Sequence, residues 1–226
     1  MIELHTSNTQ NARKISIMLE ECALPYEIHW VDLIKGEQKE KPFLKLNPNG
    51  RIPAIVDPDV QGDPVTIAET GAILIYLAEK TGKFLPSDGQ NRWSVLQWLM
   101  WQMSGIGPTF GNLAHFVAAV NPDAPTVNSY LRASRAKEVS QYAIQRFGAE
   151  AMRLISVLES LLQQKYFIAD ELSIADFATY AWVESIWPGF KAKRPTINDD
   201  FPNTALWMET LRSRPAVKRG LEKLAW

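Results

Sequence analysis

The stretch 51–80 constrains the fold most, because it predicts two strands and a buried helix in quick succession. Residues 52–56 (IPAIV) are short, apolar and β-branched, which is typical of a buried strand. Residues 57–64 are rich in Pro, Gly and Asp and predict a turn before a second strand at 65–67. Residues 69–80 predict a helix that is apolar on nearly every side, and such a helix is buried on every side. The sheet can cover one of its faces, so the rest of the chain is expected to cover the other.

The same stretch carries groups that suit a peptide ligand. Pro53 has no N–H, so we expect it at the start of an edge strand, where a cis peptide bond would turn the Ile52 backbone outward to pair with an extended peptide. Glu69 and Thr70 begin the next helix, whose free N–H groups attract a carboxylate, while the Glu69 carboxylate attracts an ammonium. A peptide backbone at Ile52 with an amino-acid head at Glu69 and Thr70 describes glutathione. The alternative for each residue alone is structural, a strand end or a helix cap.

Composition excludes several classes of protein. The chain has 226 residues, of which 46% are apolar and 22% charged, as expected for one large or two small globular domains. A formal net charge of −1 argues against a nucleic-acid partner. No apolar run is long enough to span a membrane and the first residues lack a signal-peptide pattern, so a cytoplasmic protein is expected. Cys22 is the only cysteine, which excludes an internal disulfide, and its place on an apolar helix stripe predicts a buried, inert thiol. No metal site is predicted.

The first 80 residues predict a mixed α/β domain. Candidate strands at 2–6 and 26–31 flank an amphipathic helix at 13–22, and a short helix at 40–46 precedes the stretch described above. The resulting order, β-α-β-α-β-β-α, is that of a thioredoxin-like fold with a glutathione site.

The loop before the first helix is where a reactive thiol would lie, but it holds Ser7, Thr9 and Asn11 and no cysteine. A helix N-terminus lowers the pKa of a nearby thiol through its partial positive charge and free N–H groups. A thiolate nucleophile would therefore come from the bound ligand. A hydroxyl or a side-chain amide could donate a hydrogen bond to its sulfur.

Residues 47–56 (NPNGRIPAIV) and 68–80 (AETGAILIYLAEK) resemble the thioredoxin-like half of soluble glutathione transferases. The likeness is greatest to the bacterial and fungal nu-class group, whose members handle oxidised glutathione and reduce disulfides, and it runs through nearly the whole chain. Thr9-Gln10-Asn11 is similar to the Thr-x-Asn turn of that group. This implies that Thr9 contacts the glutathione sulfur and that Asn11 contacts the sulfur and the backbone. The structural alternative is that Asn11 caps the helix and Thr9 belongs only to the turn.

The resemblance implies further roles. His5 stands where many transferases have a catalytic tyrosine, which disfavours the tyrosine-type classes. Gln38 matches a Gln or Lys that reaches the glycine carboxylate of glutathione, and Arg51 is a candidate charge partner for the same group. Residues 142–147 (YAIQRF) resemble a nu-class segment whose Arg reaches oxidised glutathione, so Arg146 is expected to bind the second glutathione. The alternative for Gln38, Arg51 and Arg146 is an ordinary solvated surface residue.

The second part of the chain predicts an all-helical domain. Residues 81–90 are rich in turn residues and predict a linker between residues 1–80 and the helical residues 91–226. Residues 105–108 (GIGP) predict a kink or break in the first helix of this domain. Residues 142–163 predict a long amphipathic helix.

Three further features belong to this helical domain. Ser173 and Asp176 form a capping box in which Asp replaces the usual Glu, and the resemblance gives it a role in folding rather than in the site. Residues 202–211 and 215–224 predict two short closing helices. Residues 117–141 look longer than the nu-class pattern, and this insertion bears on the entrance to the site and on the dimer edge.

The resemblance implies a glutathione-dependent disulfide-bond oxidoreductase that works as a homodimer on small-molecule thiols and disulfides, with reduced or disulfide glutathione as cofactor. Thr9 and Asn11 would hold the sulfur, and the remaining contacts would come from Gln38, Arg51, Ile52, Glu69, Thr70 and Arg146. One alternative is conjugation of electrophiles by the same thiolate. Another is a glutathione-binding or scaffolding protein with little turnover, because fold does not set function.

Overall fold

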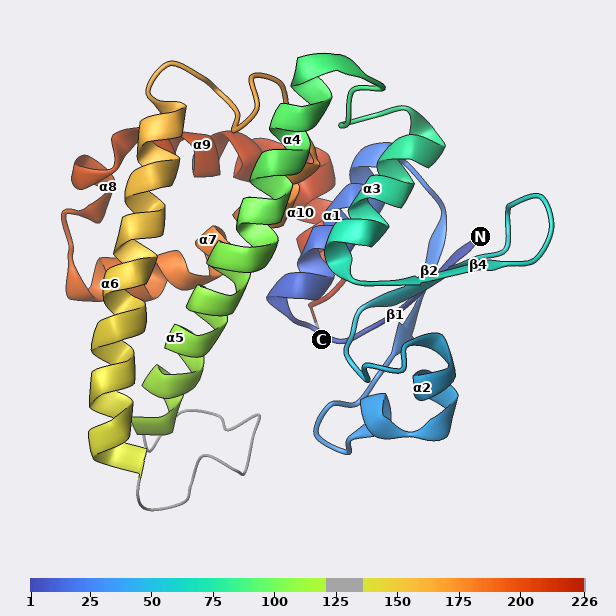
Figure 1. The fold of residues 1–226 in the computed structure, drawn as a ribbon, viewed down its shortest axis with the longest axis horizontal. Helices are drawn as coiled ribbons and strands as arrows, with labels where there is room; N and C mark the ends of the chain where they lie inside the picture. Colours follow the sequence, from blue (N-terminus) through green and yellow to red (C-terminus); the bar gives the residue numbers. More distant parts are fainter. Residues whose placement is uncertain (121–135, 226) are drawn as a thin grey trace.

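The computed structural model describes residues 1–120 and 136–225, and in it a small mixed sheet packs beside a bundle of helices (Figure 1). The sheet has the order β2-β1-β3-β4, with β1 and β2 parallel and the other two pairings antiparallel. The expected thioredoxin-like N-terminal domain followed by a helical domain is confirmed. The strands are β1 (Ile2–Thr6), β2 (Tyr26–Trp30), β3 (Ala54–Asp57) and β4 (Val65–Ala68).

The helices follow the expected order, with small differences at their ends. Those of the N-terminal domain are α1 (Gln10–Cys22), the 3₁₀ turn η1 (Glu37–Lys39), α2 (Lys41–Leu46) and α3 (Thr70–Thr81). The bundle contains α4 (Gly89–Trp101), the π-helical segment η2 (Gln102–Ile106), α5 (Gly107–Val120), α6 (Ala136–Leu162), α7 (Ile174–Lys193), α8 (Ile197–Asp200), α9 (Pro202–Ser213) and α10 (Pro215–Glu222).

The strand that follows Pro53 differs from its prediction in two ways. It begins at Ala54 rather than at Ile52, and it is an inner strand between β1 and β4 rather than an edge. The Ile52–Pro53 peptide bond is cis, as anticipated. Proline is tolerated here because it lies just outside the ladder, so its missing N–H breaks no inter-strand hydrogen bond.

Helix α3 is not buried on every side, so that prediction is wrong. Ile73, Leu74 and Leu77 are buried against the rest of the domain. Ala72 is exposed, and the helix therefore keeps part of its apolar surface uncovered within the described residues. An apolar helix face needs a partner, and no element of the described chain supplies one over this part of α3.

Helix α1 is buried more completely than an amphipathic helix would be. It packs against α3, α7 and α10, so Lys14 and Ser16 on its polar side are buried as well. The Ser16 hydroxyl donates to the Gly220 carbonyl at 2.7 Å. A Cβ at Gly220 would lie only 2.7 Å from Cα of Ile17, so glycine is what allows α10 to approach α1 this closely. The polar face was expected in water because periodicity does not reveal a second covering layer.

The chain between α4 and α5 stays helical. The Gly- and Pro-containing stretch at 105–108 produces no break, because η2 widens the helix by one π turn and α5 begins directly at Gly107. Single π turns of this kind occur often at functional sites. The insertion predicted at 117–141 largely falls at 121–135, outside the described residues.

The start of α7 has the predicted capping box. The Asp176 carboxylate accepts hydrogen bonds from the backbone N–H groups of Ile168 and Ser173, both at 3.0 Å, and from Trp207 Nε1 at 2.9 Å. Asp176 is fully buried, and burial raises the pKa of its carboxyl to about 6 against the lowering effect of these hydrogen bonds. The box therefore joins three segments of the bundle at one carboxylate.

Candidate functional site

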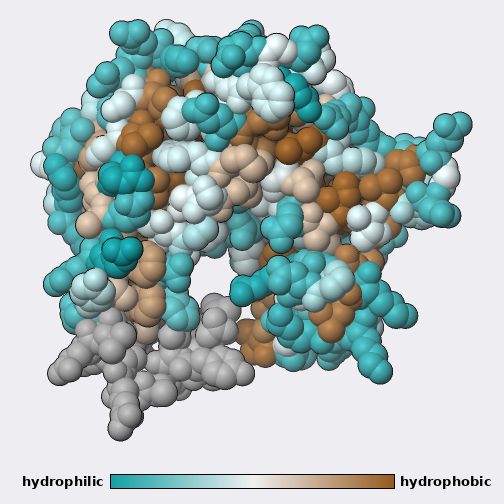
Figure 2. Space-filling view, in the orientation of Figure 1, coloured by the Kyte–Doolittle hydropathy of each residue, from teal (hydrophilic) through white to brown (hydrophobic). Residues whose placement is uncertain are grey.

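One cavity of about 990 Å³ collects the site residues that were predicted in the N-terminal domain. It lies between that domain and α7, and Figure 2 shows the surface open between the helical bundle and the lobe that contains α2. This volume is at the upper end of the range for small-molecule sites. Its lining includes Thr9, Asn11, Gln38, Arg51, Ile52, Glu69 and Thr70.

The N-terminus of α1 opens into this cavity. Thr9, not Asn11, is the cap, since its Oγ1 accepts from Ala12 N–H at 3.2 Å. The first intrahelical donor is Arg13 N–H, which donates to the Thr9 carbonyl at 3.0 Å. The Thr9 oxygen accepts through a lone pair, so its hydroxyl proton remains available to a ligand. The helix start therefore presents a hydroxyl donor and a partial positive charge to the cavity.

Asn11 lies in the first turn of α1 and is held from the other domain. Trp182 on α7, 171 residues away in sequence, donates its indole N–H to Asn11 Oδ1 at 3.1 Å. Both residues line the cavity. The carbonyl oxygen of the Asn11 amide is thus engaged, and the NH₂ group of the same amide is the part left to donate to a ligand.

The opposite wall offers backbone groups and a second helix start. Ile52 lies outside the ladder, and none of the backbone hydrogen bonds found outside the helices and strands of the described chain involves it. Glu69 precedes α3 with φ 67° and ψ 114°, an unusual conformation for a residue with a side chain, and its side chain does not cap the helix. Such outliers persist where the surrounding structure enforces them, often at ligand sites. Thr70 then opens α3, whose N-terminus suits an anion.

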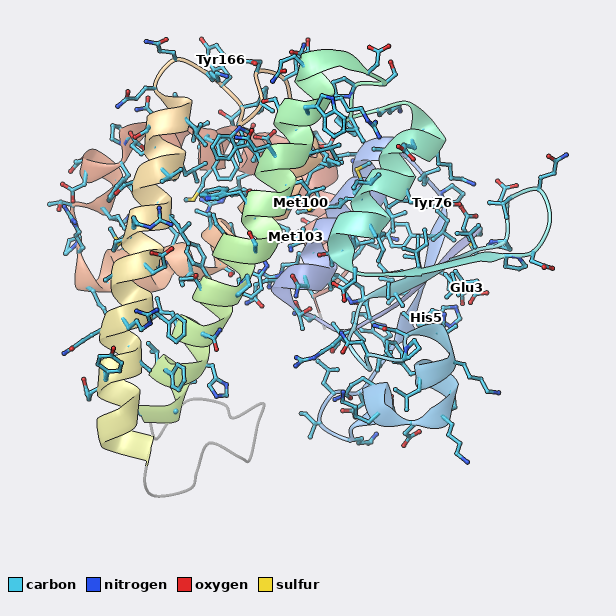
Figure 3. The ribbon with its side chains drawn as sticks, viewed as in Figure 1. Glu3, His5, Tyr76, Met100, Met103 and Tyr166 are labelled. Atoms are coloured by element: carbon cyan, nitrogen blue, oxygen red, sulfur yellow. The ribbon has the colours of Figure 1, made fainter. Side chains whose placement is uncertain are left out.

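A buried lysine lies directly beneath this wall. Lys14 Nζ donates to Gln102 Oε1 at 2.9 Å and to Thr70 Oγ1 at 3.3 Å, and it lies 3.9 Å from the sulfur of Met103, which is labelled in Figure 3. Burial lowers the pKa of Lys14 to about 7, and the nearby Glu69 carboxylate opposes this shift. The Thr70 hydroxyl accepts from Lys14 and in turn donates to the sulfur of Met103 at 3.5 Å. What Thr70 offers to the cavity is therefore its place at the start of α3.

The remaining predicted residues divide into two groups. Gln38 and Arg51 line the cavity, and Oε1 of Gln38 is buried with no hydrogen-bond partner in the described chain. A buried polar atom of this kind calls for an explanation such as a ligand or a bound water. Arg146 is exposed on α6 and does not belong to the described lining of the cavity; its electrostatic neighbour is Glu150. The structure therefore gathers all the predicted residues except Arg146.

Two groups considered in the sequence lie outside the cavity. His5 Nε2 contacts the Glu3 carboxylate at 3.2 Å, as Figure 3 shows, and the His5 ring stacks on His29 with centroids 4.6 Å apart. Cys22 is buried, and burial raises the pKa of its thiol. Neither side chain can reach a ligand in the cavity, so no protein thiol described here competes with a ligand sulfur.

Sequence reasoning missed two residues of the site. Lys14 gave no usable signal, because a lysine beside the apolar stripe of an amphipathic helix is ordinarily solvated. Trp182 gave no local signal: it is one of eight tryptophans, and only the packing of α7 on α1 brings it to Asn11. Contacts between residues this far apart in sequence cannot be read from periodicity.

Comparison with known proteins places the whole chain in one family. Residues 10–80 match the family described as the glutathione S-transferase N-terminal domain, and residues 104–215 match the glutathione S-transferase C-terminal domain. The disulfide-bond oxidoreductase YfcG of Escherichia coli is 39% identical over 226 residues, which cover 99% of this chain and 95% of YfcG. The chain belongs to the glutathione S-transferase family.

Solved structures of related transferases share the fold of this glutathione S-transferase. A glutathione transferase of Burkholderia graminis with two glutathione molecules bound per subunit has a TM-score of 0.85 and 40% identity, with 99% of this chain and 88% of that chain covered. A Pseudomonas putida glutathione transferase with one glutathione disulfide bound per subunit has a TM-score of 0.83 and 36% identity, with coverages of 98% and 90%. The predicted resemblance is confirmed at the level of family and fold.

The chemistry of this transferase site follows from its donors. Two helix N-termini, a hydroxyl and a primary amide face one cavity, which suits a sulfur anion at α1 and a carboxylate at α3. In the described part of the chain, no group of three or more His, Cys, Asp or Glu side chains is placed to hold a metal ion. Among the described residues, no helix is both long and apolar enough to cross a bilayer.

Proposed function

We propose that this glutathione S-transferase is a disulfide-bond oxidoreductase that uses bound glutathione as its thiol. The observation that carries the proposal is the α1 N-terminus, where Thr9 and Asn11 offer two side-chain donors in a loop without cysteine. Donors and a helix N-terminus together stabilise a thiolate. Glutathione supplies that thiolate, because the one protein thiol, Cys22, is buried.

The proposed contacts use the residues gathered in the cavity. The Thr9 hydroxyl and the Asn11 amide donate to the sulfur, and the Ile52 backbone pairs with the cysteinyl residue in the manner of an added strand. Glu69 and Thr70 receive the γ-glutamyl ammonium and carboxylate. At the other end of glutathione, the side-chain amide of Gln38 and the guanidinium of Arg51 bind the glycine carboxylate.

Disulfide reduction is favoured over other reactions by the size of the cavity and by the relatives. In the net reaction two glutathione thiols are oxidised to one glutathione disulfide, while one substrate disulfide is reduced to two thiols. A cavity of about 990 Å³ is large for one small molecule, and the related structures carry two glutathiones or one glutathione disulfide. The role of Arg146 at the second glutathione rests on the family resemblance alone.

Conjugation of electrophiles is the second candidate. The lining of the cavity includes the apolar side chains of Leu33, Ile34 and Trp182, which an electrophile could contact. Conjugation needs one bound glutathione and an apolar acceptor wall, whereas disulfide exchange needs room for two. If the protein catalyses neither reaction, the remaining alternative is a glutathione-binding or scaffolding protein with little turnover.

We also propose that the protein is a homodimer. Trp93 is 65% exposed and Met100 is 49% exposed, seven residues apart on α4, and Ala72 is exposed on α3. Exposed apolar groups of this kind mark interaction sites.

We also propose that the chain divides into an N-terminal domain at residues 1–80, a linker at 81–90 and a helical domain at 91–226. The end of α3 at Thr81 and the start of α4 at Gly89 support this division. The cytoplasmic location stays a prediction from sequence.

The test of the proposed function is glutathione-dependent reduction of hydroxyethyl disulfide, coupled to glutathione reductase. We expect robust turnover by the wild-type protein, and an Asn11→Ala variant should lose about tenfold or more, since a hydrogen bond to a charged group contributes roughly 1.5–3 kcal/mol. Turnover with aryl halides but not with the disulfide would instead support conjugation. Absence of both activities in a protein that binds glutathione would support a binding role.

Thr9 needs its own control because it caps α1. Thr9→Ala should lower turnover and also reduce the free energy of unfolding by about 1 kcal/mol through the lost cap. Thr9→Ser keeps both the cap and the donor, so it should retain turnover and stability. Equal turnover in wild type, Thr9→Ala and Asn11→Ala would contradict the proposed sulfur contacts.

A further inference from the structure

Resting on the proposed function, we propose that Trp182 is a positioning residue that sets the ionisation of the glutathione thiol by fixing which end of the Asn11 amide faces it. The hydrogen bond from Trp182 Nε1 to Asn11 Oδ1 is 3.1 Å long and joins α7 of the helical domain to the first turn of α1. Trp182 also lines the cavity beside Asn11. The helical domain thus controls a donor of the N-terminal domain.

The indole ring is held in place by helix α5. A Cβ at Gly111 would lie 3.2 Å from Cη2 of Trp182, and a Cβ at Gly107 would lie 3.8 Å from its Nε1. The ring therefore packs against the glycine side of α5, and even one methyl group at Gly111 would push it by a few tenths of an ångström. The direction of the indole N–H is set by packing as well as by the hydrogen bond itself.

The chemical identity of the partner decides the orientation of the amide. An asparagine amide has two ends of nearly equal size, one that accepts and one that donates. An indole N–H can only donate, so it selects the carbonyl oxygen of Asn11 and leaves the NH₂ end for the ligand. An NH₂ group donating to sulfur favours the thiolate, whereas a carbonyl oxygen facing sulfur disfavours it.

The matched control lies on the same helix. Trp187 donates its Nε1–H to Asn198 Oδ1 at 2.9 Å, is buried, and does not line the described cavity. Trp182→Phe and Trp187→Phe therefore remove the same group and the same kind of hydrogen bond from α7. Only the first removes the donor that orients Asn11.

The experiment is an ultraviolet titration of the thiolate of glutathione bound to each variant, with the pH profile of kcat/KM beside it. In Trp182→Phe we expect the thiolate fraction at neutral pH to fall by roughly tenfold, the size of one hydrogen bond to a charged group. The rate should recover at high pH, where the thiol ionises without help, and KM should stay within about twofold because the contacts to the rest of glutathione persist. Trp187→Phe should show the wild-type titration.

Two further variants separate positioning from loss of structure. Trp182→Phe added to Asn11→Ala should change the titration no further, because the amide it orients is gone. Gly111→Ala displaces the ring while leaving Trp182 and Asn11 in the chain, and it should shift the titration in the same direction. A wild-type titration in Trp182→Phe together with a lowered thiolate in Asn11→Ala would overturn the role of Trp182. No thiolate in the wild-type complex at any accessible pH would overturn the proposed function itself.

Discussion

At the scale of single residues, the site depends on side chains whose hydrogen-bond options are restricted by a neighbour. Thr9 accepts from Ala12 N–H and is left to donate its hydroxyl proton. Asn11 accepts from Trp182 and is left to donate its amide. Thr70 differs, because it accepts from Lys14 and donates its proton to the sulfur of Met103. The restrictions on Thr9 and Asn11 turn groups that could accept or donate into donors, which is what an anionic ligand needs.

Lys14 gives a pH-dependent prediction at this scale. Its pKa is lowered by burial to about 7, whereas an unfolded lysine keeps its proton to about 10.5. Between these values the unfolded chain binds more protons than the folded one, so this residue makes the free energy of unfolding rise with pH. Below about pH 7 both states are protonated, so the cost of burying the charge is at its largest and does not change with pH. Above about pH 7 this cost is relieved, and the free energy of unfolding rises by at most about 1.4 kcal/mol per pH unit.

The measurement is urea unfolding of wild type and Lys14→Met at a series of pH values from 6 to 10. The stability of Lys14→Met relative to wild type should be highest at pH 6 and should decline steadily above about pH 7, because the variant lacks the titrating amine. Lys45→Met, a change at an exposed lysine of α2, serves as the control and should run parallel to wild type. A parallel profile for Lys14→Met would show that the amine stays charged in the folded protein.

At the scale of elements, helix ends and one helix irregularity place the functional groups. The N-termini of α1 and α3 open into the cavity, and the π turn η2 brings Gln102 and Met103 against Lys14. The glycines and proline at 105–108 were correctly identified as an irregularity, which takes the form of the π-helical segment that ends at Ile106 and leads directly into α5.

The capping box gives the prediction for α7. Asp176→Asn keeps the size of the side chain but points an NH₂ group at buried N–H donors, so at least one of Ile168 N–H, Ser173 N–H and Trp207 Nε1–H loses its acceptor. Each unsatisfied buried donor costs about 1–3 kcal/mol, and we expect a total loss of roughly 2–4 kcal/mol in the free energy of unfolding. Chemical unfolding measures it, with Asp199→Asn at an exposed site of α8 as the control. A loss no larger than that control would contradict the role of the box.

At the scale of the whole molecule, the uncovered surface of α3 and α4 indicates a second copy of the chain. Trp93→Glu and Met100→Glu should each shift the protein from dimer to monomer, because an interface core tolerates a buried, unpaired carboxylate poorly. Light scattering coupled to size-exclusion chromatography measures the mass. Leu206→Glu, at a 60% exposed leucine of α9, should leave the mass unchanged. A wild-type monomer, or a dimer in all three variants, would contradict the assignment of this face.

Local patterns in the sequence were enough to predict several features. The order of the main strands and helices, the capping box and the seven cavity residues of the N-terminal domain were predicted, and a cis Ile52–Pro53 bond was considered as a possibility. Each depends on residues close together in the chain: periodicity, helix starts and turn residues act over a few positions. Glutathione itself was inferred from Ile52, Glu69 and Thr70, whereas the roles of Thr9, Asn11 and Gln38 came from the family resemblance.

The burial of polar groups and the contacts between distant residues became visible in the folded chain alone. The tertiary structure placed β3 inside the sheet, buried Lys14 on the polar side of α1, uncovered Ala72 on α3 and brought Trp182 to Asn11. The physical reason is the same in each case. The environment of a helix face is set by what packs on it, and the elements that pack on α1 come from the other end of the chain. A local pattern records how a segment folds but carries no information about its distant neighbours.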